Sequence, residues 1–153
     1  MSAQFSVAQF TATKWATAEE KAKALNGLIR FIEAGFLEQR FTKAIYYALS
    51  QHLLGHCAEY DRRGFYRSWF ATPGKRLGWL KYAVSGGIHG GSYGLGDPAW
   101  TWSDVETELI RWVTANGLVD EYQQLVNRMT EQRELAELDR LIMKYGARRE
   151  VAA

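Results

Sequence analysis

The sequence predicts an all-α fold: a compact bundle of about five helices with an N-terminal extended arm and a Gly-rich loop. Apolar residues recur at spacings of three and four along most of the chain, which is the period of a helix with one buried face. Helix-capping residues precede these stretches, and only two of the 153 residues are proline. The length is that of one domain, so we expect residues 1–153 to form a single helical domain.

The first sixteen residues alternate apolar and polar side chains, which predicts an extended arm or a short strand. Thr17 followed by Glu20 forms a capping box, in which each side chain binds a free amide at the helix start. We expect the helix to run to about Ala34 on an apolar face. Gly35 follows at the position where a left-handed residue ends a helix.

From Phe36 to Tyr60, apolar residues cover most of the circumference of a predicted helix, as is typical of a central buried helix. The aromatic-rich sequence from Phe65 to Phe70 predicts a short helix after a turn. Thr72 and Pro73 fit an N-cap and a first helical residue. The helix that they begin is expected to end at Gly86-Gly87.

Residues 85–98 contain six glycines and no helical period, which predicts a loop. Ser103 and Glu106 suggest a second capping box, and Asn116-Gly117 suggests the end of that helix. Asp120 is a candidate cap for a last helix that runs to about Tyr145. A gap in its apolar spacing breaks a strict heptad, which favours a bundle helix over a continuous coiled coil.

The formal net charge of +2 is unevenly distributed along the chain. Between Tyr60 and Tyr82 six cations accompany one acid, whereas residues 97–139 contain ten acids and three arginines. The two segments either pack side by side and neutralise each other or present charged surfaces to a partner.

Composition also bears on the compartment. Cys57 is the only cysteine, which excludes an intrachain disulfide and favours a reducing, cytoplasmic compartment. Neither a signal peptide nor an apolar stretch long enough for a membrane span is present, so we expect no membrane partner.

The segment from residue 60 to 82 interleaves cations with aromatic residues. Such a mixture is typical of protein-interface hot spots and also of single-stranded nucleic-acid sites, where bases stack on rings. It is equally compatible with core rings lined by surface cations. Together with two residues of the Gly-rich loop, the candidate partner-binding residues are Arg62, Arg63, Tyr66, Arg67, Trp69, Lys75, Arg76, Trp79, His89 and Tyr93.

His52 and His56 stand four residues apart, so both can project from one helix face, as metal ligands do. The residue after His52 is leucine instead of the glutamate of a metalloprotease, and His89 is the only other histidine. We therefore expect no stoichiometric metal and no cofactor. The Gly-rich loop matches no nucleotide-binding motif and could contact a partner, cross between helices or bind a ligand.

These patterns favour a non-enzymatic binding or inhibitor protein with a protein partner. One specific form of this hypothesis is a phage or mobile-element accessory protein that acts on a host defence nuclease. The first alternative is a nucleic-acid-binding module that uses residues 60–82, and the second is a small metal-dependent enzyme that uses His52, His56 and His89. The acidic middle and basic end of the helix at residues 120–145 would complement each other in an antiparallel homodimer. The same charges are equally compatible with a monomer that exposes this face of the helix.

Overall fold

The computed structural model describes residues 5–53, 61–85 and 96–152, with side chains up to Gly146. Six α-helices lie in these ranges, and no strand does. The helices are α1 (Ala18–Glu33), α2 (Lys43–Tyr47), α3 (Arg62–Trp69), α4 (Pro73–Val84), α5 (Ser103–Ala115) and α6 (Leu118–Ala152). Two 3-10 turns, η1 (Val7–Gln9) and η2 (Glu38–Arg40), and a π-helix, η3 (Ala48–His52), complete the assignment. The predicted all-α class is confirmed.

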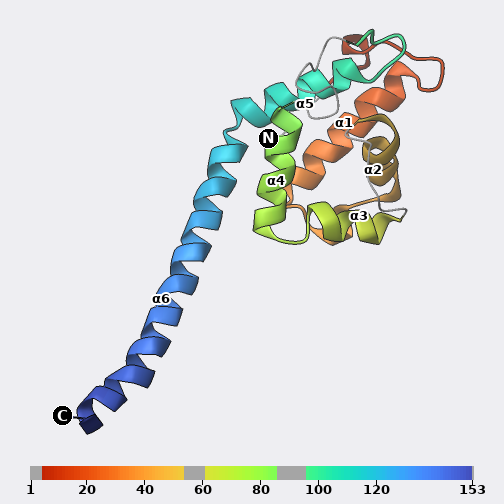
Figure 1. Cartoon of the computed structure of the whole chain (residues 1–153). Helices are drawn as coiled ribbons and strands as arrows, with labels where there is room; N and C mark the ends of the chain where they lie inside the picture. The colour runs from red at the N-terminus through yellow and green to blue at the C-terminus, as the bar shows by residue number, and fades with distance from the viewer. Residues whose placement is uncertain (1–4, 54–60, 86–95, 153) are drawn as a thin grey trace.

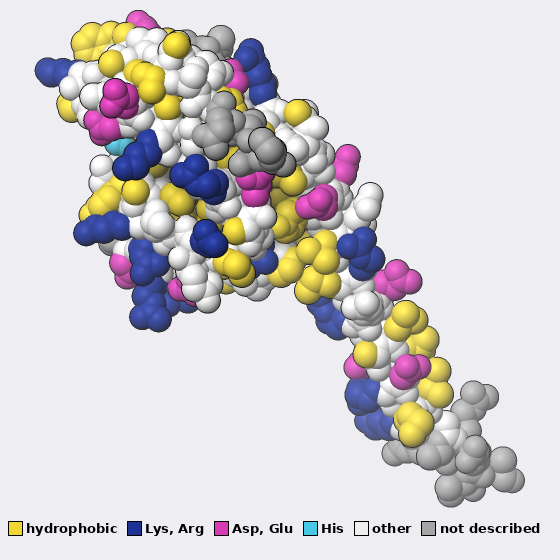
Figure 2. Space-filling view, turned by 180° about the vertical axis from the view of Figure 1, so that it is seen from behind, with side chains coloured by type: hydrophobic (Ala, Val, Ile, Leu, Met, Phe, Trp, Pro, Cys, Tyr) yellow, Lys and Arg dark blue, Asp and Glu magenta, His cyan; other side chains and the backbone are white. Residues whose placement is uncertain are grey.

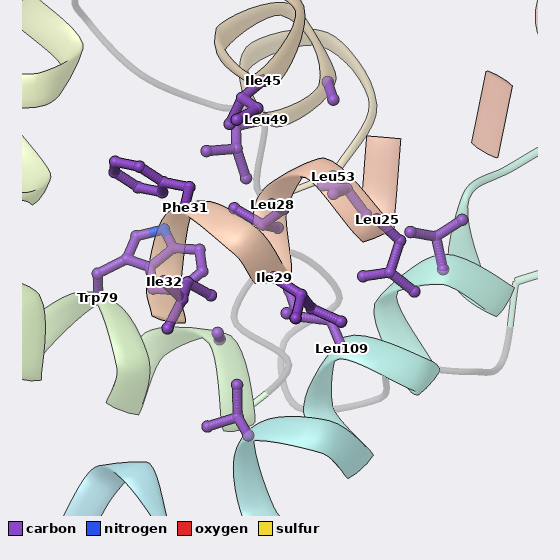
Figure 3. Close-up of a cluster of buried hydrophobic side chains, with 14 of the residues drawn as sticks. Leu25, Leu28, Ile29, Phe31, Ile32, Ile45, Leu49, Leu53, Trp79 and Leu109 are labelled. Atoms are coloured by element: carbon purple, nitrogen blue, oxygen red, sulfur yellow. The ribbon is translucent and has the colours of Figure 1, made fainter. Parts of the chain in front are cut away.

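Helix α1 passes through the middle of the domain, with α2, α3, α4 and α5 arranged around it (Figure 1). Its buried face consists of residues at spacings of three and four, namely Leu25, Leu28, Ile29 and Ile32. These side chains meet buried residues of the neighbouring elements, among them Trp79 of α4 (Figure 3). Burial of each such side chain contributes about 1.5–3 kcal/mol.

Five phenylalanines fill the end of the core where α1 meets α3. Their ring centroids lie 5.1 Å apart for Phe31 and Phe70 and 5.9 Å apart for Phe41 and Phe65. Phe36 stacks on Phe70 at 5.4 Å, and each of the five side chains is at most 1% exposed. Much of the high aromatic content is therefore core packing.

The beginning and end of α1 agree with the sequence. Thr17 Oγ1 accepts a hydrogen bond from the Glu20 N–H at 3.0 Å, and Glu20 Oε1 accepts one from the Thr17 N–H at 3.2 Å. Gly35 has φ +79°, and the next residue, Phe36, also lies in the left-handed region at φ +58°. Two successive residues of this kind turn the chain sharply back toward the core.

The single central helix predicted from Phe36 to Tyr60 is wrong. The chain forms η2, begins α2 after the N-cap Thr42 and widens into the π-helix η3. The description ends at Leu53, and residues 54–60 lie outside it. The apolar face is nonetheless real, because Phe41, Ile45, Leu49 and Leu53 are all buried at four-residue spacing. That spacing cannot distinguish one long helix from short turns that share a buried face.

Several predicted boundaries also differ from the structure. The N-terminal arm contains the 3-10 turn η1, and α3 begins at Arg62 because Asp61 Oδ1 accepts from the Gly64 N–H at 2.6 Å. The second capping box is wrong: Ser103 is the first residue of α5, and its hydroxyl donates to the Gly96 carbonyl at 2.6 Å. The Thr72–Pro73 start of α4 and the Gly117 end of α5, at φ +61°, are confirmed.

Helix α6 is longer and less packed than predicted. It begins at Leu118, two residues before the predicted cap Asp120, and continues for 35 residues. Its first turns pack on α4 and α5, and the rest projects away from the domain (Figure 1). Every side chain from Glu131 to Arg140 is exposed, so this half is no bundle helix. None of the described helices combines the length and apolar character that a membrane crossing requires.

Candidate functional site

The predicted aromatic and basic segment forms α3 and α4, and two of its rings lie in the core. Tyr66 is 7% exposed and donates its hydroxyl to the Phe36 carbonyl. Trp79 is 1% exposed and packs edge-on against Phe70 at 5.3 Å. Neither side chain is available to a partner, which corrects their assignment as binding residues.

Three cations of the segment bind backbone carbonyl groups of their own domain. Arg62 Nη1 donates to the Phe41 carbonyl at 3.1 Å, and Lys75 Nζ donates to the carbonyl of Arg67 at 2.7 Å. Arg76 Nε donates to the Phe70 carbonyl at 2.7 Å, and its guanidinium lies 5.9 Å from the centre of the Phe36 ring. These contacts fix the ends of α3 and the turn to α4.

The remaining residues of the segment form what we call the basic surface: Arg63, Arg67, Trp69, Lys81 and Tyr82. The three cations are exposed, and Trp69 and Tyr82 are half-buried with ring centroids 5.5 Å apart. Arg63 and Arg67 stand four residues apart and share one face of α3. The ion pairs found in the described ranges lie elsewhere, at Lys21, Arg111 and Arg140. Figure 2 shows lysine and arginine side chains spread over the domain body.

The predicted histidine site is described only at His52. Its ring stacks on Trp102 at 4.6 Å with an interplanar angle of 5°. Burial lowers the pKa of His52 from its ordinary value of 6.5, and the nearby Glu20 opposes this shift. His56, His89 and Tyr93 lie outside the described residues, as does most of the Gly-rich loop. Within the described ranges no group of three potential metal ligands comes together.

A cleft of about 440 Å³ that the sequence did not predict lies between α1 and α2. Its floor is apolar and includes Ala24, Gly27 and Ile45, and the stacked pair of His52 and Trp102 forms part of its wall. Its charged lining residues are Glu20, Lys23, Arg30 and Arg40. The lining residues come from three separate stretches of the chain, residues 20–31, residues 39–52 and Trp102, so no local motif marks the cleft.

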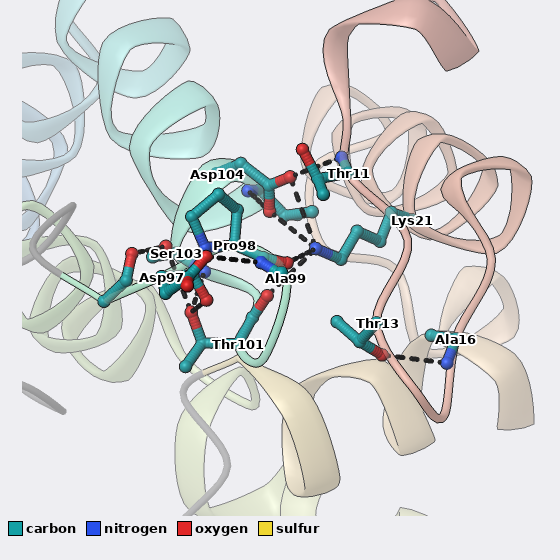
Figure 4. Close-up of polar contacts among 12 residues, drawn as sticks. Thr11, Thr13, Ala16, Lys21, Asp97, Pro98, Ala99, Thr101, Ser103 and Asp104 are labelled. Atoms are coloured by element: carbon teal, nitrogen blue, oxygen red, sulfur yellow. Dashed lines mark hydrogen bonds and ion pairs between the residues drawn. The ribbon is translucent and has the colours of Figure 1, made fainter.

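A buried lysine holds the turn that carries Trp102 (Figure 4). Lys21 Nζ donates to the carbonyls of Pro98 and Thr101, each at 2.9 Å, and lies 3.0 Å from Asp104 Oδ1. The second oxygen of Asp104 accepts from the Thr11 N–H at 3.0 Å. This network was not predicted from the sequence, although Lys21 falls four residues before Leu25 on the buried face of α1, an unusual place for a charge.

Comparison of the chain with protein-family models, with curated proteins and with solved structures gives no match.

Proposed function

We propose that this protein is a non-enzymatic binding protein that contacts an acidic surface of a protein partner through the basic surface of α3 and α4. The observation that carries the proposal is the group of three exposed cations on α3 and α4, Arg63, Arg67 and Lys81, without a described acidic partner. The half-buried pair of Trp69 and Tyr82 belongs to the same two helices. Arginine and aromatic residues are both enriched in interface hot spots.

The charge distribution supports an acidic partner. The described residues up to Ser85 contain twelve cations and five acids, whereas those from Gly96 to Gly146 contain five cations and ten acids. The excess of cations lies in the part of the chain that contains the basic surface, and opposite charge on a partner raises the association rate.

A nucleic-acid partner is the alternative. Single-stranded nucleic acids bind along a positive groove in which successive bases stack on separate rings. In the described part of the basic surface, the half-buried rings of Trp69 and Tyr82 already pack against each other at an interplanar angle of 33°. That arrangement favours a compact protein contact over a run of stacked bases.

The test is capture of a partner from host lysate, followed by affinity measurements with the purified partner. We expect Arg63→Glu with Arg67→Glu to weaken binding by more than about tenfold. Arg111→Glu with Arg133→Glu, an equal charge change on exposed residues of α5 and α6, should alter it less than about twofold. Equal losses of affinity for the partner in both double variants would contradict a role for the basic surface.

Three further measurements distinguish the other functional hypotheses. Tight binding to a single-stranded oligonucleotide that weakens steeply with salt would favour the nucleic-acid alternative. One equivalent of zinc, lost in His52→Ala, would favour the metal-dependent enzyme. The captured protein is also assayed for nuclease activity. If it cleaves nucleic acid, and the wild type inhibits this activity but the Arg63→Glu, Arg67→Glu variant does not, the narrower hypothesis of an inhibitor of host defence is supported.

A further inference from the structure

The projecting half of α6 exposes a regular line of large apolar side chains. Leu135, Leu138, Ile142 and Tyr145 are 53%, 50%, 57% and 44% exposed. Their spacings of three, four and three are those of the a and d positions of two consecutive heptads, which form the contact line of a coiled coil. We call these four residues the distal seam.

The distal seam faces away from the domain. Leu118, Tyr122 and Leu125 at the start of α6 pack against the core. At about 100° per residue, the distal seam is rotated by roughly half a turn from that packed face. Figure 2 shows hydrophobic side chains along one edge of the projecting helix. The chain's own domain therefore cannot cover the distal seam while α6 stays a continuous helix.

We propose that a second copy of this chain covers the distal seam, with the two α6 helices antiparallel about a two-fold axis at residue 140. Antiparallel helices pack a positions against d positions. In this register Leu135 lies against Tyr145 of the second copy, and Leu138 lies against Ile142 of the second copy. The two-fold axis repeats both contacts, which gives four consecutive apolar layers.

Other registers are less complementary. A shift by one heptad in one direction places Ile142 opposite Glu131 and Tyr145 opposite Arg128. A shift in the other direction places Leu138 opposite the charged position 149. In a parallel pair in register, Glu134 of each copy would lie beside Asp139 of the other copy, at the g and e positions that flank the seam. These two like-charged pairs would destabilise the coiled coil. The antiparallel register centred on residue 140 brings only one like-charged flanking pair together, the two Asp139 residues, and is therefore favoured.

The length and charge of α6 fit the same arrangement. Position 128 lies opposite position 152, where α6 ends, so the partner helix spans the projecting segment and stops before Val126, which packs on the core. The sequence also has Glu131 and Glu134 at one end of the seam and two arginines, at positions 148 and 149, at the other. Antiparallel pairing brings these opposite charges together at both ends.

Sedimentation equilibrium of the full chain over a range of concentrations tests the proposal, independently of the basic surface. We expect a dimer whose dissociation constant rises by more than about 100-fold in Leu138→Ala with Ile142→Ala, since the large-to-small changes occur in both copies. Alanine preserves the helix, so circular dichroism should show no loss of helicity beyond that caused by dissociation. The matched control is Met143→Ala, because Met143 is 77% exposed but lies outside the distal seam. A monomer at all concentrations, or a dimer equally sensitive to both variants, would overturn the proposal.

Cysteine cross-linking tests the orientation. In a Cys57→Ser background, a tagged chain with Leu138→Cys is mixed with an untagged chain with Ile142→Cys and oxidised. The antiparallel register predicts a disulfide between the two different chains. Disulfides formed instead within each single-variant population would indicate a parallel pair and overturn the proposed arrangement.

Discussion

The buried ion pair of Lys21 and Asp104 connects α1 to the start of α5. The lysine side chain is fully buried and the aspartate side chain is 15% exposed. A buried charge is tolerated only when its hydrogen bonds are complete, and oxygen atoms of three residues surround Lys21 Nζ. The pair therefore holds in place the turn that presents Trp102 to His52.

Lys21→Met should destabilise the protein by about 3–5 kcal/mol, because Asp104 and two carbonyls lose their common donor. Lys23→Met, a change of the same type at an exposed position two residues away, should change the free energy of unfolding by less than about 0.5 kcal/mol. Urea denaturation of both variants measures the difference. A similar free energy of unfolding for the two variants would show that the buried pair contributes little.

His52 links stability to pH. Its pKa is lowered in the folded protein, mainly by burial, so below about pH 6.5 the unfolded chain binds a proton that the folded protein resists. Stability should therefore fall as the pH decreases through this range. His52→Phe keeps a ring against Trp102 without a titrating group. The variant should lose less stability than the wild type between about pH 7.5 and pH 5.5 in urea titrations. Parallel curves would contradict the role of His52.

At the scale of elements, glycine acts differently at the end of a helix and within one. Gly35 ends α1 at φ +79°, whereas Gly78 lies inside α4 without a positive φ. An added Cβ meets no other atom within 4 Å at either position. The effect of alanine at these sites therefore depends on backbone conformation and not on packing.

Gly35→Ala should destabilise the protein by about 1 kcal/mol, because an L-residue is strained in the left-handed region. Gly78→Ala should instead stabilise it by about 0.4–1 kcal/mol, since alanine restricts the unfolded chain and favours helix. The midpoints of thermal unfolding should thus move in opposite directions. A shift of both in the same direction would mean that local packing outweighs backbone conformation.

At the scale of the whole molecule, α6 divides into a packed half and a projecting half. The packed half contributes Tyr122 and Leu125 to the domain, whereas the side chains of residues 131–140 are all exposed. We therefore expect the free energy of unfolding of the domain to be independent of the projecting half.

Deletion of residues 131–153 should leave the thermal midpoint of the domain within about 4 °C of the full chain, because no described core contact is removed. The comparison is made at a concentration below the dissociation constant of the proposed dimer, so that association does not contribute. Differential scanning calorimetry measures both midpoints. A larger loss would show that the projecting half stabilises the domain itself.

The sequence alone determined the helical class and those helix ends that depend on neighbouring residues. The Thr17 capping box, the Thr72–Pro73 start and the glycine stops after α1 and α5 require only local backbone chemistry. The apolar face of the segment after Phe36 was also visible, because burial repeats at regular spacing whether or not the helix is continuous.

Only the tertiary structure decided what the aromatic and charged residues do. Trp79 and Tyr66 lie in the core, Arg62 and Arg76 bind backbone carbonyls, and Lys21 is buried, although each residue type alone suggests a surface contact. The cleft between α1 and α2 was not predictable because its lining comes from distant segments. The projection of α6 could not be predicted from the sequence either. Helical periodicity shows that a face is apolar, but only the arrangement of the other helices shows whether anything covers that face.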